Sequence, residues 1–142
     1  QGSDVVASMV VFTNSASNNA EYRKFKTSLN RNNDFYNMHE TLERRLSERN
    51  TKQWGLPDFV LIDGGKGQLN AGMAAFEALG IRPPTVISLA KREEEIYLPG
   101  VEEPLRLSRH AYALRLLQYV RDEAHRFAQH YHHILRRKTL EG

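Results

Sequence analysis

Hydrophobic and polar positions divide the first part of the 142-residue chain into alternating, strand-like segments. A β-branched run over 5–12 (VVASMVVF) predicts a strand, and the alternation of aromatic and charged residues over 21–26 (EYRKFK) predicts a second one. The Ser- and Asn-rich stretch over 14–19 reads as a turn between them. The pattern therefore predicts an antiparallel hairpin with one face in water.

Helical and strand-like patterns then alternate along the middle of the chain. Apolar residues recur at helical spacing to about residue 49, after a cap at Asn33 or Asp34, and WGLP at 54–57 ends this helix. Four consecutive apolar residues at 59–62 (FVLI) predict a strand buried on both faces. A glycine-rich turn (DGGKG, 63–67) leads into a predicted helix over 68–79 that Gly80 closes, and TVISLA over 85–90 predicts another buried strand.

The last third begins with short elements and ends in one long helix. A charged turn over 91–95 precedes two short edge strands, 96–98 and 105–107, and helical spacing starts near Ala111. Strands and helices in this order predict a single α/β domain, a mixed β-sheet flanked by helices. A chain of this length buries a core without disulfides or a structural metal.

Composition narrows the class of protein. Apolar residues make up 40% of the chain and charged residues 26%, which excludes wholesale disorder. The absence of cysteine excludes disulfide scaffolds, thiol catalysis and Cys-ligated metal sites. No apolar run reaches membrane-spanning length and no signal segment opens the chain, so we expect a soluble cytoplasmic protein.

Positive charge gathers in the C-terminal segment. Residues 105–142 hold eight Lys or Arg against three acids, a local charge of +5, whereas the preceding residues carry −2 of the total of +3. Such a segment fits a polyanion such as nucleic acid. A solvated helix face explains the same charge, and both interpretations stay open on charge alone.

Asp63 is the sharpest candidate for chemistry. It follows a predicted buried strand and precedes a glycine turn into a helix, which is the edge where α/β folds bind ligands. A simple turn aspartate is the competing interpretation, because Asp-Gly is common turn chemistry.

The glycine turn after Asp63 does not match a nucleotide-binding loop. Lys66 is followed by Gly67 and not by the Ser or Thr that a Walker loop needs, and the GxGxxG spacing is absent. We therefore expect no nucleotide cofactor, and a small-molecule α/β enzyme is disfavoured.

His125 and Asp34 are weaker candidates on pattern alone. Asp122 and Arg121 precede His125 by three and four residues, so a helix brings them to the same face, where an imidazole could orient water, accept a proton or bind a metal. A surface histidine in a charged helix is the more common case. Asp34 is more simply read as a helix N-cap.

The block PDFVLIDGGKGQL (57–69) lies at the centre of a series of motifs. The others are VVASMVVF, EYRKF, NDF, SLAK and LRLLQ leading into RDEAHRFA. In this order the motifs resemble the C-terminal endonuclease domain of UvrC, the nuclease subunit of bacterial nucleotide excision repair. The central block carries most of the resemblance, which spans nearly the whole chain.

The resemblance implies a ribonuclease-H-like fold and a divalent-metal-dependent endonuclease that cuts DNA 5′ of a lesion after loading by UvrB. It implies that Asp63 is a catalytic, metal-binding aspartate, Asp34 a further carboxylate and His125 the catalytic histidine, with Mg²⁺ or Mn²⁺ as cofactor. Positive charge that offsets DNA phosphates is expected from four side chains. These are Lys66, Arg23, Lys24 and Arg121.

Two departures from the family pattern set further expectations. The family's principal metal carboxylate lies on a strand before the position matched by Gly2, and SRHAYA at 108–113 replaces a proline-bearing stretch. We assign the domain to residues 1–139, with 140–142 as natural sequence or a tag remnant. Because the upstream aspartate is absent, we expect these 142 residues alone to be inactive, and the alternative is a DNA- or protein-docking module of the same fold that does not cut.

Overall fold

A computed structural model describes residues 6–9, 12–13, 16–17, 23–26 and 34–141, with side chains for 38–53 and 55–129. In chain order its elements are β1 (Val6–Met9), β2 (Phe12–Thr13), β3 (Ala16–Ser17), β4 (Arg23–Lys26), α1 (Asp34–Arg45), α2 (Glu48–Trp54), β5 (Phe59–Asp63), α3 (Lys66–Leu79), β6 (Thr85–Ala90), the 3₁₀ turn η2 (Arg92–Glu94), β7 (Glu95–Tyr97) and α4 (Tyr112–Glu141).

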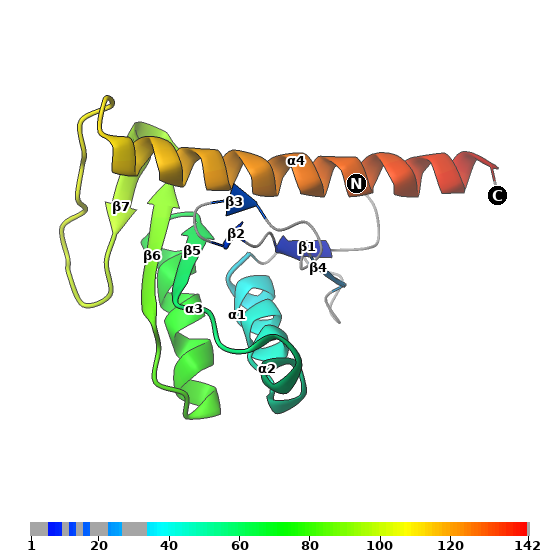
Figure 1. Ribbon diagram of the computed structural model, residues 1–142, viewed down its shortest axis with the longest axis horizontal. Coiled ribbons are helices and arrows are strands. Elements are labelled where there is room, and N and C mark those ends of the chain that lie inside the picture. Colours follow the sequence, from blue (N-terminus) through cyan, green and yellow to red (C-terminus); the bar gives the residue numbers. More distant parts are fainter. Residues whose placement is uncertain (1–5, 10–11, 14–15, 18–22, 27–33, 142) are drawn as a thin grey trace.

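A three-stranded mixed sheet, ordered β5-β6-β7, forms the centre (Figure 1). β5 and β6 run parallel, in a register that pairs Phe59 with Thr85 and Asp63 with Leu89. β7 returns antiparallel, with Leu89 opposite Ile96. This arrangement confirms the predicted mixed α/β class and brings the carboxyl ends of β5 and β6 to one edge.

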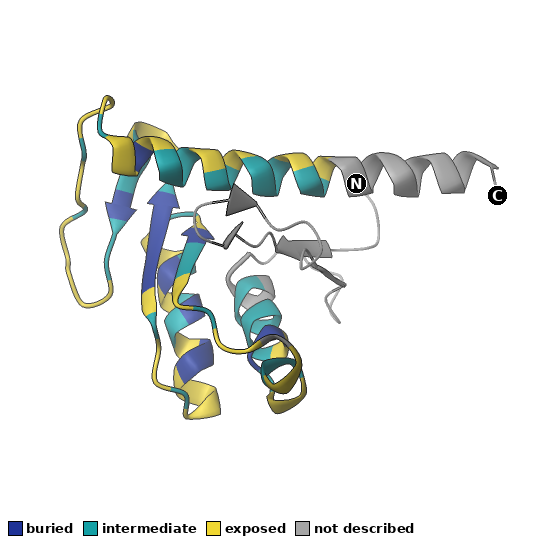
Figure 2. Cartoon of the chain, in the orientation of Figure 1, coloured by how far each residue is buried: buried dark blue, intermediate teal, exposed yellow. Residues whose placement is uncertain are grey.

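Successive residues of these strands enter two separate cores, one on each face of the sheet. Ile62 and Val86 pack with α1 and α3, in a cluster that includes Leu46, Leu69 and Phe76. Ile87 and Leu89 face the other way, toward Leu114 of α4. Figure 2 shows the buried residues on these strands and on the inner side of α3. Burial on both faces explains why these strands read as unbroken apolar runs.

The prediction for the first of these strands needs one correction. Phe59, at the start of β5, is 47% exposed, Val60 and Leu61 are half-buried, and within this strand only Ile62 is fully buried. β5 is the outer strand in the order β5-β6-β7, so a neighbouring strand covers it on one side only.

Two short antiparallel ladders precede the helices. β1 pairs with β4, from Val6 opposite Lys26 to Met9 opposite Arg23, as the hairpin prediction requires. The single strand predicted over 5–12 is wrong in detail, because Phe12–Thr13 belongs to a second ladder with Ala16–Ser17. The residues predicted as a turn thus supply β3.

The helix predicted to run to about residue 49 is in fact two helices. α1 ends at Arg45, and Ser47 takes an extended conformation (ψ 156°) that starts α2. The Asn50 backbone N–H donates to the Ser47 hydroxyl at 3.4 Å, so this serine works as an N-cap. Asp34 begins α1, but its side chain and its predicted capping role lie outside the described residues.

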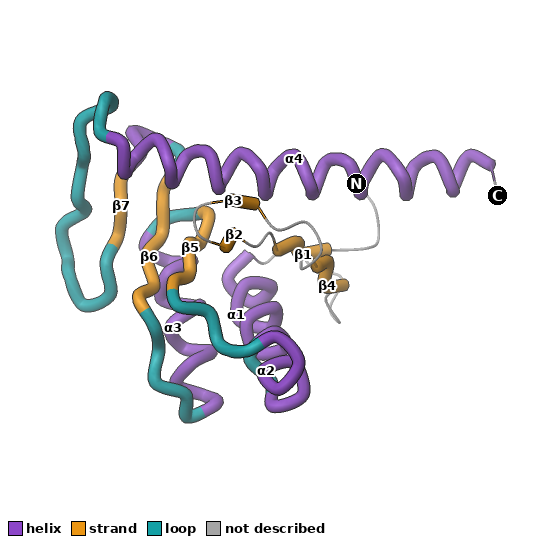
Figure 3. The backbone as a smooth tube through the Cα atoms, in the orientation of Figure 1, coloured by secondary structure: helices purple, strands orange, loops and turns teal. Residues whose placement is uncertain are grey.

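α4 is a 30-residue helix that crosses the carboxyl edge of β5 and β6 (Figure 1). A long loop joins it to β7, as the tube in Figure 3 shows. The strand predicted over 105–107 reduces to a single bridge between Leu105 and Ile96. Within the described chain, no helix is both long and apolar enough to cross a bilayer.

Candidate active site

Asp63 is the last residue of β5, at the edge that α4 crosses. Its side chain is 45% exposed. The pairing with β6 continues one residue further, since the Gly64 N–H donates to the Leu89 carbonyl at 3.1 Å. The pairing with β6 thus fixes the backbone at Asp63, while the carboxylate itself is open to solvent.

The turn that follows Asp63 requires glycine. Gly64 has φ +146°, and a Cβ there would lie 2.6 Å from the Gln68 Cγ. The Gln68 side chain fills this space because it caps α3, accepting the Gly65 N–H at 3.0 Å. α3 therefore starts at Lys66, two residues earlier than predicted, and the chain leaves the sheet directly after the carboxylate.

His125, on α4, meets Asp63 across 62 positions of sequence. Its Nε2 lies 2.5 Å from the Asp63 Oδ2, and the imidazole is 44% exposed. The structure thus brings together two of the three residues predicted to be catalytic.

The orientation of the His125 ring sets what it can do. A protonated Nε2 donates to the Asp63 carboxylate, which leaves Nδ1 on the opposite side of the ring. Nδ1 forms no hydrogen bond with any residue whose side chain is described. In the neutral ring, Nδ1 can accept a proton from water, as in other carboxylate–histidine pairs.

A second polar cluster lies one helical turn before His125. The Glu94 carboxylate accepts hydrogen bonds from Arg121 Nη1 at 2.7 Å, from Arg121 Nη2 at 3.2 Å and from Gln118 Nε2 at 2.7 Å. The Arg121 guanidinium holds the pKa of Glu94 below its ordinary value, against the effect of partial burial, and Gln118 adds to the lowering. Glu94 in turn raises the pKa of Arg121.

Sequence reasoning did not find Glu94 or Gln118. The signal that could have found Gln118 is its spacing, since Gln118, Arg121 and His125 follow Leu114 along one helix face. Glu94 is hidden in a run of three glutamates in the charged turn.

The other predicted site residues are placed less completely. Lys66 is exposed at the start of α3, and its Nζ donates to the Glu102 carbonyl at 3.4 Å. Arg23 and Lys24 lie on β4, opposite Met9 and Ser8. The side chains of Arg23, Lys24 and Asp34 are outside the described residues, so their predicted roles stay predictions.

The donor groups at this edge supply part of what a divalent metal needs. Asp63 offers a hard carboxylate oxygen, Oδ1, that no described residue engages, on a side chain open to solvent. Among the side chains that the structure describes, no three carboxylate or imidazole groups cluster tightly enough to hold a metal together. Asp63 therefore fits a hard cation as one ligand of a larger set.

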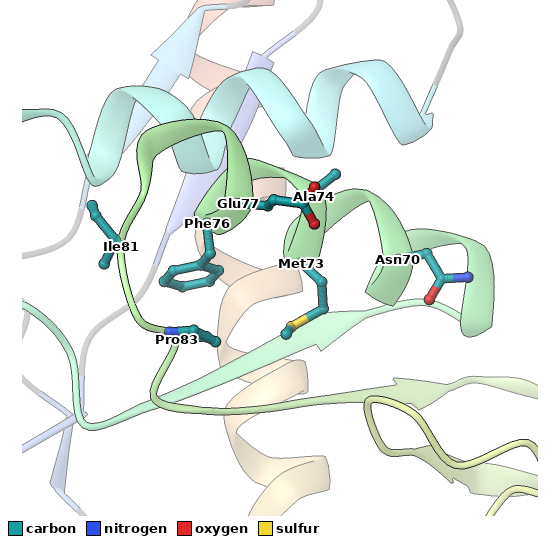
Figure 4. A pocket seen from close by; sticks show the side chains of 7 residues that line it. All are labelled: Asn70, Met73, Ala74, Phe76, Glu77, Ile81 and Pro83. Atoms are coloured by element: carbon teal, nitrogen blue, oxygen red, sulfur yellow. The ribbon is translucent and has the colours of Figure 1, made fainter.

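A hollow of about 430 Å³ lies elsewhere, beside α3 (Figure 4). Its lining is Asn70, Met73, Ala74, Phe76, Glu77, Ile81 and Pro83. None of the predicted site residues contributes to it, so the hollow and the Asp63–His125 pair are separate features.

Comparison with known proteins places this geometry in a family. The model of the UvrC RNase H endonuclease domain matches residues 1–129. The chain belongs to the UvrC RNase H endonuclease domain family. This confirms the resemblance predicted from the sequence.

Curated relatives agree with the family assignment. UvrABC system protein C of Gemmatimonas aurantiaca is 53% identical over 90% of this chain, and that of Acidobacterium capsulatum is 50% identical over 93%. UvrABC system protein C of Dictyoglomus thermophilum is 46% identical over 99% of the chain. The chain covers 21%, 21% and 23% of these proteins, so it spans about a fifth of their length. A divalent metal is implied for a UvrC nuclease domain.

Proposed function

We propose that this domain makes the 5′ incision beside a lesion in nucleotide excision repair, by metal-dependent hydrolysis of a phosphodiester. The observation that carries the proposal is the 2.5 Å contact between Asp63 and His125 at the carboxyl edge of the sheet. A carboxylate and an imidazole that meet at an exposed strand end are the groups that such hydrolysis needs.

Asp63 is the proposed metal ligand, through the carboxylate oxygen that His125 does not use. Mg²⁺ or Mn²⁺, when bound, would polarise the scissile phosphate and lower the pKa of a bound water. Asp34 opens α1, and we propose its carboxylate as a supporting ligand because of the family motif that contains it.

His125 is the proposed base or water-orienting group. Its Nε2 is held by Asp63, which fixes the ring and leaves Nδ1 to accept a proton from water. A carboxylate in this position also stabilises the imidazolium that forms when Nδ1 takes a proton.

Basic side chains would hold the DNA backbone. Lys66 lies three residues after Asp63 on the first turn of α3, and its exposed ammonium would exchange its 3.4 Å contact with the Glu102 carbonyl for a DNA phosphate. Arg23, Lys24 and Arg121 remain further candidates for contacts with DNA phosphates. Both terminal nitrogens of Arg121 already donate hydrogen bonds to Glu94. The partners proposed for the reaction are damaged duplex DNA and UvrB.

The test is single-turnover incision of a lesion-containing duplex by the full-length protein that carries this chain, loaded by its UvrA and UvrB partners. We expect a 5′ cut in Mg²⁺ or Mn²⁺, no cut in excess EDTA, and loss of that cut alone in Asp63→Asn. Unchanged cutting in EDTA would contradict the metal assignment. A 5′ cut that persists in Asp63→Asn would instead favour a docking role for the domain.

A further inference from the structure

One face of α4 changes from buried and apolar to polar along its length. Leu114, Gln118, Arg121 and His125 follow one another at spacings of four, three and four residues, which places them on one stripe of the helix. Leu114 is 2% exposed in the core. The next two side chains meet Glu94, and the fourth meets Asp63.

Glu94 holds this stripe by three hydrogen bonds. Both terminal nitrogens of Arg121 donate to its two oxygens, and Gln118 donates at 2.7 Å from the preceding turn. A two-point contact between guanidinium and carboxylate fixes orientation as well as distance. The Arg121 side chain is 12% exposed and that of Glu94 is 29% exposed, so the pair is partly shielded from water.

The backbone that presents Glu94 is in an unfavourable conformation. Glu93 and Glu94 have φ values of 59° and 50°, in the left-handed region that side chains other than glycine rarely adopt. Two such residues in succession raise the energy of the turn, and residues of this kind cluster at functional sites. In this conformation the Glu94 carboxylate contacts Gln118 and Arg121 of α4.

Two side-chain contacts therefore join α4 to the sheet region: Glu94 with Arg121, and Asp63 with His125. Asp63 lies in the sheet, where it pairs with Leu89 on β6, and Glu94 ends the turn η2 that joins β6 to β7. Arg121 and His125 belong to α4, one turn apart. Along α4, the Glu94–Arg121 contact therefore lies between the buried Leu114 and the Asp63–His125 contact.

We propose that Glu94 and Arg121 are positioning residues for incision, whose ion pair keeps His125 at hydrogen-bonding distance from Asp63. This inference rests on the proposed function of the Asp63–His125 pair. It differs from the sequence-based prediction that Arg121 binds DNA, because a phosphate contact would change DNA affinity, whereas a positioning contact changes the rate once DNA is bound.

The test measures the single-turnover rate at saturating protein, and DNA affinity separately, for Glu94→Gln and Arg121→Lys in the full-length protein. Arg121→Lys keeps the charge but removes the two-point hydrogen bonding. We expect each substitution to lower the saturated rate about 10-fold and to change affinity by less than about 2-fold. Thermal midpoints of all variants show whether they fold.

The control is a second ion pair, at the hairpin that β6 and β7 form. Arg106 binds Glu95 and lies 3.7 Å from Glu93, and neither contact involves α4. Glu95→Gln and Arg106→Lys should therefore leave the saturated rate within about 2-fold of the unmodified protein. An equal loss in these controls would overturn the proposal, because it would show a general effect of weakening the hairpin.

A double-mutant cycle shows whether Glu94 acts through His125. In a His125→Gln background, Glu94→Gln should slow residual incision by less than about 2-fold, because the group that it positions is gone. A full additional loss, an unchanged rate in Glu94→Gln, or an effect on affinity alone would each overturn the proposal. If His125→Gln itself cuts at the unmodified rate, the proposed function of the site fails instead.

A structural measurement supports the cycle without using activity. The chain contains no cysteine, so nitroxide labels at Glu77→Cys on α3 and Gln129→Cys on α4 report the placement of the helix, with cysteines outside this chain replaced by serine. We expect the distance distribution to broaden in Glu94→Gln and to stay unchanged in Glu95→Gln. Identical distributions in all three proteins would overturn the proposed positioning role.

Discussion

His125 Nε2 and Asp63 Oδ2 lie 2.5 Å apart, although the residues are 62 positions apart in sequence and belong to different elements. The helix and the strand that carry them meet at the carboxyl edge of the sheet. Both side chains are nearly half exposed, so the contact is made where a substrate can reach it.

This pair predicts a large effect of small, shape-preserving substitutions. Asp63→Asn and His125→Gln should each lower the rate of 5′ incision by about 10²-fold or more, because each removes a group proposed to act on the reacting atoms. Thermal midpoints should change little, since neither side chain is buried. Quenched-flow incision assays and thermal melts measure the two effects.

Matched controls exist within the same chain. Asp58 precedes the opposite end of β5, so Asp58→Asn removes the same charge away from the site. His39 contacts Glu43 on α1 at 3.0 Å, so His39→Gln breaks another histidine–carboxylate pair. Both should cut at nearly the unmodified rate, and a comparable loss in either would contradict the assignment of the site.

Gly64 predicts a steric effect on stability. Gly64→Ala combines an unfavourable φ of +146° with a clash against the Gln68 side chain. We expect it to lower the free energy of unfolding by about 2–3 kcal/mol and to reduce incision, because the turn fixes Asp63. Chemical denaturation measures the loss.

Gly100 is the control for this prediction. It also has a positive φ, +75°, but no atom lies within 4 Å of a Cβ built there. Gly100→Ala should therefore cost only the conformational part, about 1 kcal/mol. Equal losses at both positions would show that the Gln68 contact does not matter.

The ion pair of Glu94 predicts a pH-dependent contribution to stability. Since Arg121 lowers the pKa of Glu94 in the folded state, the carboxylate stabilises the fold fully above the unfolded-state pKa of about 4.3. This contribution disappears as the pH falls through the lower folded-state pKa. The difference in unfolding free energy between the unmodified protein and Glu94→Gln should be constant from pH 7 to about 5 and shrink below about 4.

Urea denaturation across this pH range measures the difference. Glu103→Gln is the control, because Glu103 is exposed and forms no ion pair with any described residue. Its difference from the unmodified protein should be small throughout. A Glu94→Gln difference that grows on acidification would contradict the sign of the effect.

The basic end of the chain predicts salt-dependent DNA binding. Neutralising Arg136, Arg137 and Lys138 to glutamine should flatten the plot of log affinity against log salt by about 0.9 for each DNA phosphate that these cations neutralise. Fluorescence anisotropy on duplex DNA measures the slope. Glutamine at Arg49, Lys52 and Arg82, which are exposed and away from α4, removes the same charge and should leave the slope unchanged. An unchanged slope in the first set would mean that these three cations face only solvent.

Much of the fold follows from local pattern. The FVLI and TVISLA runs are the strands that enter both cores, and Gly80 ends α3 as predicted. Its conformation there is left-handed, with φ 66°. The break at Ser47 could not be predicted, because apolar spacing continues through Leu46, whereas the cap depends on a single hydroxyl.

The site could be predicted only in part. The pattern of residues singled out Asp63 and gave His125 as a weaker candidate, which the family resemblance strengthened, but no local rule gives the contact between them. The Glu94 interaction depends on two glutamates in left-handed conformations, which propensity disfavours, so it could only come from the three-dimensional arrangement.

Because α4 is long, a small tilt of the helix produces a large displacement far from the point about which it tilts. Leu114 anchors the helix in the core, and His125 lies eleven residues further on, about 16 Å along the axis at 1.5 Å per residue. A tilt of about 10° at Leu114 would move the imidazole by about 3 Å, enough to break its hydrogen bond, whereas the same tilt about Arg121 moves it by about 1 Å. The position of the imidazole is therefore set most precisely by a contact close to it on α4, and a small tilt of the helix about Leu114 becomes a large change in the distance between His125 and Asp63.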